Sequence, residues 1–280
     1  MNFQSGMRCV GGLLSALTLL LFSSALESSA AEVLVIAASP GLARPLQALG
    51  HAFETTHPEV RVRLYFDAGL DLRRTIAALE NDFSGRYFIN SGPIHLIAPG
   101  GDELITRLEQ KYYVLPGTRT AYATESLVLI VPESLVEAPT SFEALVENPH
   151  LRIAMADPEL TALGRQSKQL LGALGILDSR GGRLDVATDV RGILDHVLSG
   201  QADVGIVYGP DAAMNRERVR VAAVAPEKLD RPIIHSIAME RYCPNRQLCE
   251  EFLGFVRSAE ARKILTGLGY GLPNGKSAAH

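Results

Sequence analysis

The residues of this chain that could do chemistry are polar groups at the junctions between predicted strands and predicted helices. Three such junctions follow one another in the sequence, within residues 153–167, 189–191 and 205–211. Because parallel strands end at one edge of an α/β lobe, we expect the three junctions to meet there. Helix N-termini carry unpaired backbone N–H groups and partial positive charge, so this edge suits a small anion.

Four residues at these junctions and at an earlier one are candidate donors to such an anion. Leu163 and Val190 each open a predicted helix, so they offer backbone N–H groups whatever their side chains are. Ser39 follows the first predicted strand, where its hydroxyl either caps the next helix or donates to an anion. Tyr208 ends a predicted strand, and its hydroxyl either reaches a ligand or belongs to a buried structural tyrosine.

Charged residues and a glycine near the same edge bear on anion binding. Arg44 falls in the first turn of a predicted helix, where it either faces the anion or is a solvated surface arginine. Asp67 either caps the next predicted helix or, if it faces the ligand, repels an anion. Gly69 lies in the turn 67–70, where the missing side chain lets the backbone approach a ligand closely.

The sequence gives no support for an enzyme. It contains no Gly-x-Ser-x-Gly elbow, His-Glu-x-x-His motif or P-loop, and no Gly-x-Gly-x-x-Gly follows a predicted strand. The histidines are scattered without His-x-x-x-His spacing, so we expect no bound metal and no cofactor. A binding protein is therefore expected rather than a catalyst.

Short apolar runs that alternate with helical patterns predict two α/β lobes. Lobe I is predicted to comprise residues 32–122 and 225–280, and lobe II residues 123–224. The predicted strands are 33–38, 60–66, 94–98, 126–132, 152–156, 204–208, 219–224 and 233–239. The predicted helices are 42–53, 71–79, 102–113, 142–147, 163–174, 190–198 and a long final helix over 245–268.

Residues 1–31 are predicted to be a cleaved signal peptide. Arg8 precedes an apolar run at 10–22, and small residues stand at 29–31. The alternative is an uncleaved membrane anchor, but the run is too short to span a bilayer comfortably. Cleavage leaves roughly 250 residues, enough for one large or two small domains, with no second long apolar segment. We therefore expect a soluble periplasmic protein.

The composition of the chain bounds its partners and its redox chemistry. Lys and Arg total 27 and Asp and Glu total 31, a net charge of −4 without basic clusters, which argues against nucleic acid. Cys243 and Cys249 remain after cleavage of the signal peptide. In an oxidising compartment they are expected to form a local disulfide, the alternative being two small buried thiols.

Several blocks, in the same order, resemble the periplasmic molybdate-binding proteins of ABC importers. That family's run Asn-(Ser/Arg)-Leu-Val-Leu-Val-x-Pro resembles residues 125–132. Its Asp-Pro-Glu-x-x-Pro-Ala-Gly-x-Tyr-Ala resembles residues 157–167. Its Asn-Val-Arg and Gly-Ile-Val-Tyr-x-(Ser/Thr)-Asp-Ala resemble residues 189–191 and 205–212. The resemblance implies a type II periplasmic binding protein, with two α/β lobes around a ligand cleft joined by two crossover strands.

The resemblance also implies a ligand and a site. The family holds molybdate or tungstate with neutral donors and delivers it to an ABC permease in the inner membrane. By this resemblance the donors here are the Ser39 hydroxyl, the backbone N–H groups of Leu163 and Val190, and the Tyr208 hydroxyl. Gly69 stands where the family has a second serine. The protein is expected to act as a monomer.

Departures from the family pattern concentrate in lobe I and motivate two alternatives. The turn 67–70 replaces a serine-rich turn, and the connection 79–93 is longer than in the family. One alternative keeps the fold but binds a different anion or an organic ligand, using Arg44. The other is a non-transport accessory or sensor protein, in which the apolar residues 87–89 contact a partner protein.

Overall fold

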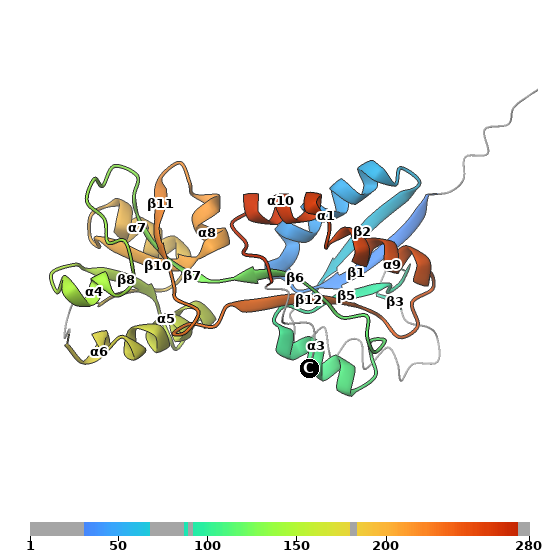
Figure 1. Cartoon of the computed structure of the whole chain (residues 1–280), viewed down its shortest axis with the longest axis horizontal. Coiled ribbons are helices and arrows are strands. Elements are labelled where there is room, and N and C mark those ends of the chain that lie inside the picture. The colour runs from blue at the N-terminus through green and yellow to red at the C-terminus, as the bar shows by residue number, and fades with distance from the viewer. Residues whose placement is uncertain (1–30, 68–86, 89–91, 180–183, 274–280) are drawn as a thin grey trace, which may run out of the picture. The chain divides into compact units, whose positions relative to one another are not determined.

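The computed structural model describes residues 31–67, 87–88, 92–179 and 184–273. Within these ranges the chain forms two five-stranded sheets and one two-stranded sheet. We call the first sheet with the helices packed on it lobe I, and the second sheet with its helices lobe II (Figure 1). The predicted signal peptide, the helix expected at 71–79 and Gly69 lie outside the described residues.

Lobe I is built on a mixed sheet with the strand order β2-β1-β5-β12-β6. Strand β1 pairs in parallel with β2 and β5, whereas β12 pairs antiparallel with β5 and β6. The strands are β1 (Glu32–Ala38), β2 (Val60–Phe66), β5 (Leu96–Ala98), β6 (Thr120–Glu125) and β12 (Ile233–Met239). The helices of this lobe are η1 (Pro40–Leu42), α1 (Ala43–Thr56), α3 (Asp102–Gln110), α9 (Arg246–Phe255) and α10 (Ala259–Gly267).

The alternation of side chains along β1 explains why helices cover both faces of this sheet. Leu34 and Ile36 point to one face, where they belong to a cluster with residues of α1, α9 and α10, among them Phe53. Ala37 points to the other face, in a cluster that contains Ile105 of α3. A strand buried on both faces reads as a continuous apolar run, as this one does.

Lobe II is built on a second mixed sheet with the strand order β11-β7-β10-β8-β9. Strands β10, β8 and β9 run parallel, and β7 pairs antiparallel with β10 and β11. The strands are β7 (Leu127–Pro132), β8 (Ile153–Ala156), β9 (Leu184–Ala187), β10 (Val204–Tyr208) and β11 (Val219–Val224). The helices are α4 (Ala144–Glu147), α5 (Ala162–Ala173), α6 (Ile176–Ser179), α7 (Val190–Leu198) and α8 (Gly209–Met214).

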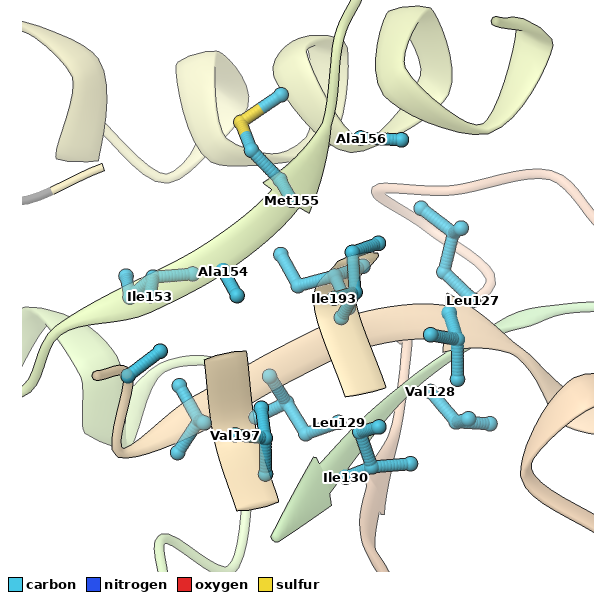
Figure 2. Packing of buried hydrophobic residues seen from close by; sticks show 14 of the residues in the cluster. Leu127, Val128, Leu129, Ile130, Ile153, Ala154, Met155, Ala156, Ile193 and Val197 are labelled. Atoms are coloured by element: carbon cyan, nitrogen blue, oxygen red, sulfur yellow. The ribbon is translucent and has the colours of Figure 1, made fainter. Parts of the chain in front are cut away.

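The core of lobe II is aliphatic. Figure 2 shows side chains of β7 and β8 packed with Ile193 and Val197 of α7, and all of them are buried. Gly205 lies beneath α7, where a Cβ atom would stand 2.7 Å from a methyl group of Ile193. This close packing fixes α7 against the sheet, so the start of α7 has a defined position at the edge of the sheet.

Two connections join the lobes. The chain passes from β6 to β7 through Ser126, and it returns from β11 to β12 through residues 225–232. The predicted arrangement of two α/β lobes joined by two crossover strands is confirmed. Strand β11 pairs with β7 in the sheet of lobe II, and β12 pairs with β6 in the sheet of lobe I.

The predicted single long helix over 245–268 is wrong. The structure divides it into α9 and α10, which are separated by a turn at residues 256–258. Ser258 has an extended backbone, and its hydroxyl accepts a hydrogen bond from the Ala261 N–H, which starts a new helix. The apolar spacing continues across this break, so periodicity alone did not reveal it.

Cys243 and Cys249 form a disulfide that joins the segment after β12 to α9. Of the predicted partner-contact residues 87–89, Tyr87–Phe88 forms the short strand β3, which pairs antiparallel with β4 (Gly92–Pro93). None of the helices within the described ranges has the length and apolar character needed to cross a membrane.

Candidate functional site

The carboxyl edge of the lobe II sheet brings together the two predicted backbone donors. Leu163 is the second residue of α5, and Val190 is the first residue of α7. The strands β8 and β9, which precede these helices, are parallel neighbours, and Asp157 N–H donates to the Ala187 carbonyl at 2.7 Å. The two helix starts are therefore held side by side by the sheet.

Each of these helix starts is capped in a way that leaves the predicted donors unused. The Thr161 hydroxyl accepts from Gly164 N–H at 2.8 Å, and the Asp189 carboxylate accepts from Gly192 N–H at 3.0 Å. The N–H groups of Leu163 and Val190 have no hydrogen-bond partner among the described residues. First-turn N–H groups of this kind are free to bind an anion.

Tyr208 lies at the same edge, at the end of β10, and takes part in a chain of hydrogen bonds. Its hydroxyl donates to Oε1 of Gln166 at 2.9 Å, and Nε2 of Gln166 donates to Oδ1 of Asp230 at 2.7 Å. Burial raises the pKa of Tyr208, and the nearby carboxylates of Glu125 and Asp230 raise it further. The hydroxyl therefore stays protonated and able to donate at neutral pH.

The carboxyl edge of the lobe I sheet holds the predicted hydroxyl donor. Ser39 precedes η1 with an extended backbone, and its side chain makes no capping hydrogen bond. Its hydroxyl has no partner among the described residues, and Gly100 is adjacent to it. The capping role considered for Ser39 is thus not observed, which leaves its hydroxyl available to a ligand.

Asp67 follows β2 beside Ser39, because β1 and β2 are parallel and Ala38 pairs with Phe66. The Asp67 N–H donates to the Ala38 carbonyl at 3.0 Å, and the residue is half-buried. A carboxylate at this place lowers the affinity of the lobe I edge for a dianion unless another group offsets its charge. Gly69, two residues further on, is outside the described residues.

Arg44 lies apart from the other predicted ligand-binding residues. It is exposed on the first turn of α1, and it lines a pocket with Arg216 and Arg218 of lobe II. None of Ser39, Leu163, Val190 and Tyr208 lines that pocket. The structure thus groups three predicted donors at the lobe II edge, places Ser39 at the lobe I edge, and assigns Arg44 to a different environment.

Two residues of the crossover strands connect these edges. Glu125 ends β6, and Nε2 of His235 in β12 lies 3.2 Å from one of its carboxylate oxygens. On the lobe I side, Gly101 forms an isolated antiparallel bridge with His235, next to the Gly100 that adjoins Ser39. On the lobe II side, the Glu125 charge acts on Tyr208. The pair of Glu125 and His235 thus lies next to the lobe I edge and close enough to the lobe II edge for its charge to act there.

Sequence reasoning did not identify the roles of Asp211, Glu125 and His235 near these edges. Asp211, in the first turn of α8, is half-buried; burial raises its pKa to about 6, and the Glu125 carboxylate contributes to the rise. Glu125 and His235 are 110 residues apart in the chain, so no local motif signals their contact. Within the described residues, no group of three or more His, Cys, Asp and Glu side chains could hold a metal ion.

We predict that Asp211→Asn stabilises the protein at neutral pH but not in acid. Because the folded-state pKa lies above the ordinary 3.8, the folded protein binds this proton more tightly, and that stabilisation is lost as pH rises through about 6. Partial exposure reduces the effect to about 1–2 kcal/mol. Thermal denaturation should show a melting temperature raised by about 2–8 °C at pH 7.5 and little changed near pH 4.

Asp102 is the matched control for this prediction. Burial alone would raise its pKa, but hydrogen bonds from Arg119 and Ser236 outweigh burial and lower it. Asp102→Asn should therefore destabilise the protein at neutral pH, and the loss should shrink as pH falls through the lowered pKa. A melting-temperature difference for Asp211→Asn that is the same at every pH would contradict the assignment of its raised pKa.

Comparison with known proteins places this architecture in a family. The family model for bacterial extracellular solute-binding proteins matches residues 34–271, which include both lobes. The chain belongs to the family of bacterial extracellular solute-binding proteins. The resemblance to molybdate-binding proteins is confirmed by a relative of known name. The molybdate-binding protein ModA of Escherichia coli is 29% identical to this chain over 157 residues.

The match to these relatives is partial. It covers 55% of this chain and 60% of Escherichia coli ModA. YvgL of Bacillus subtilis is 28% identical over 151 residues, which are 54% of this chain and 57% of that protein. Among solved structures, a substrate-binding domain from Clostridium difficile superposes with a TM-score of 0.75 at 22% identity, covering 86% of this chain and 99% of that one. This solute-binding protein therefore shares the fold of such domains while its sequence has diverged.

Proposed function

We propose that this solute-binding protein captures a small tetrahedral oxyanion, molybdate or tungstate, in the periplasm. It would act there as a monomer after cleavage of its signal peptide, and it would deliver the anion to an ABC permease in the inner membrane. The lobes would close on the anion, and the permease would recognise the closed form. The observation that carries the proposal is the pair of unused backbone N–H groups at Leu163 and Val190, beside the protonated Tyr208 hydroxyl.

The donor set suits an oxyanion for a physical reason. Each donor is neutral and fixed by the sheet edge, so it can replace part of the hydration shell of the anion without a reorganisation of the protein. Each hydrogen bond to a charged group contributes about 1.5–3 kcal/mol, so three or four of them give substantial affinity. The Ser39 hydroxyl supplies the corresponding donor from lobe I.

Calorimetric titration of the mature protein with molybdate, tungstate and sulfate tests this proposal. We expect binding of molybdate and tungstate, and weaker or no binding of sulfate. Thermal denaturation with each anion provides a second readout, because a ligand that binds only the folded state raises the melting temperature. The absence of both heat and thermal stabilisation with molybdate and with tungstate would refute the choice of ligand.

A second candidate keeps the fold and the transport role but changes the ligand. The favouring observation is the set of carboxylates near the donors: Asp67 beside Ser39, Asp189 at the start of α7, and Glu125 between the edges. These charges oppose a dianion and favour a ligand of lower charge, or one with a hydrogen-bond donor of its own. A thermal-denaturation screen tests this candidate. It is supported if sulfate, molybdate and tungstate leave the melting temperature unchanged while an organic monoanion raises it.

A further inference from the structure

A second polar pocket lies apart from the donors described above. It has a volume of about 500 Å³, and the charged side chains that line it are Arg44, Arg216, Arg218 and Glu217. Lobe I contributes Arg44 at the start of α1 and the end of α10, and lobe II contributes the end of α8 and the turn that follows it. An occupant of this pocket would therefore contact both lobes.

The three arginines of this pocket have no carboxylate partner among the residues that the structure describes. Arg44, Arg216 and Arg218 form no ion pair with any described residue, and Glu217 is not within ion-pair distance of them. Arg119 and Arg152, by contrast, are engaged with carboxylates. Arginine binds carboxylate and phosphate groups through two parallel N–H donors, so unpaired arginines around one pocket favour such ligands.

The turn that carries two of these arginines is rigidly built. The Asn215 carbonyl accepts from Arg218 N–H at 2.9 Å and from Val219 N–H at 3.0 Å, and the Asn215 side chain donates to the Asp211 carbonyl. The Arg218 carbonyl in turn accepts from Glu133 N–H at 3.1 Å. The backbone that carries Arg216 and Arg218 is therefore largely fixed before a ligand arrives, which limits the entropy lost on binding to that of the side chains.

We propose that this pocket binds a small organic polyanion, one that carries two or more carboxylate or phosphate groups. The volume of the pocket is typical of sites for small organic molecules, whereas a bare tetrahedral oxyanion would leave most of it empty. Its charge also differs from that of the predicted oxyanion site, where carboxylates such as Glu125 lie close to the donors. This site is independent of the oxyanion proposal.

These arginines could also serve only to stabilise the ends of helices, and that role leads to a different expected result. Helices α8 and α10 both end at the pocket, and cations near helix C-termini stabilise the exposed carbonyl groups. If this were their only role, replacing them would lower the melting temperature without changing the binding of any anion. The decisive measurement is therefore ligand binding, with stability recorded alongside.

Citrate and 2-phosphoglycerate are suitable probes, titrated by calorimetry into the mature protein at low ionic strength. We expect binding that weakens as salt is added. Arg44→Gln should weaken it about ten-fold to a hundred-fold, and the double variant Arg216→Gln/Arg218→Gln should weaken it further. Arg262→Gln, on an exposed position of α10 outside the pocket, is the matched control and should bind as the wild type does.

The proposal is overturned if neither probe binds the wild type, or if the double variant binds the probes as tightly as the wild type does. A loss of stability in the double variant with unchanged probe binding would also overturn it, in favour of the helix-end role. Molybdate titration of the same preparations reports separately on the oxyanion proposal, and it should be unaffected by the double variant.

Discussion

Replacement of Gly164 by alanine is expected to destabilise the protein by about 3 kcal/mol and to weaken oxyanion binding at least ten-fold. A Cβ atom on this residue would lie 2.4 Å from the Ala156 carbonyl oxygen and 2.4 Å from the carbonyl atoms of Asp157. These are backbone atoms at the end of β8, so they cannot move aside as a flexible side chain could. The start of α5 must therefore move away from the sheet.

Such a movement affects three features of the site together. It would break the cap between Thr161 and Gly164 N–H, displace the Leu163 N–H, and shift the Gln166 that accepts from Tyr208. Thermal denaturation should show a melting temperature lowered by about 6–12 °C, and calorimetry with molybdate should show the loss of affinity.

Gly172→Ala in the same helix is the matched control. There the nearest atom to an added Cβ would be a terminal methyl group of Leu177 at 3.3 Å, which can rotate away. Alanine is favoured over glycine inside a helix by about 0.5–1 kcal/mol, so this variant should be as stable as the wild type or slightly more stable. If Gly164→Ala melted and bound like Gly172→Ala, the close approach of α5 to β8 would not constrain the site.

The sequence predicted the helix starts at the lobe II edge because helix starts follow from local rules. Thr161 and Asp189 are N-cap residues in the short connections that follow β8 and β9, so the helix starts that carry Leu163 and Val190 could be located from local residue types. The backbone supplies these donors, and their existence does not depend on any tertiary contact. The same reasoning located Tyr208 at the end of β10.

The features that the sequence did not reveal depend on contacts between distant segments. The hydrogen bond between Tyr208 and Gln166 spans 42 residues, and the contact between His235 and Glu125 spans 110. Arg44 was considered as an anion ligand beside Ser39, but tertiary packing places it in a pocket with arginines of lobe II. Neither periodicity nor a short motif carries information about such pairings.

The second large effect is expected for Tyr208→Phe, which should weaken oxyanion binding about ten-fold to a hundred-fold. The variant removes one hydrogen bond to a charged ligand, worth about 1.5–3 kcal/mol, and keeps the ring. In the structure the hydroxyl donates its single proton to Gln166, so it must turn from this acceptor to the anion when a ligand binds. Calorimetric titration with molybdate measures the change directly.

Tyr122→Phe is the matched control, because it removes a tyrosine hydroxyl away from the predicted donors. Tyr122 is 2% exposed, and its hydroxyl has no hydrogen-bond partner among the described residues. Its removal should leave binding unchanged and leave stability unchanged or slightly higher, since an unsatisfied buried polar group is lost.

Equal affinities for Tyr208→Phe and wild type would show that the hydroxyl stays on Gln166 when the anion binds. In that case Tyr208 would serve the packing of α5 against β10, and the backbone N–H groups of Leu163 and Val190 would carry recognition at this edge. A weakened affinity would instead mean that the anion displaces Gln166 as the acceptor. The hydrogen-bond chain from Tyr208 to Asp230 would then be an arrangement of the ligand-free protein, and its disruption would be part of the free-energy cost of binding.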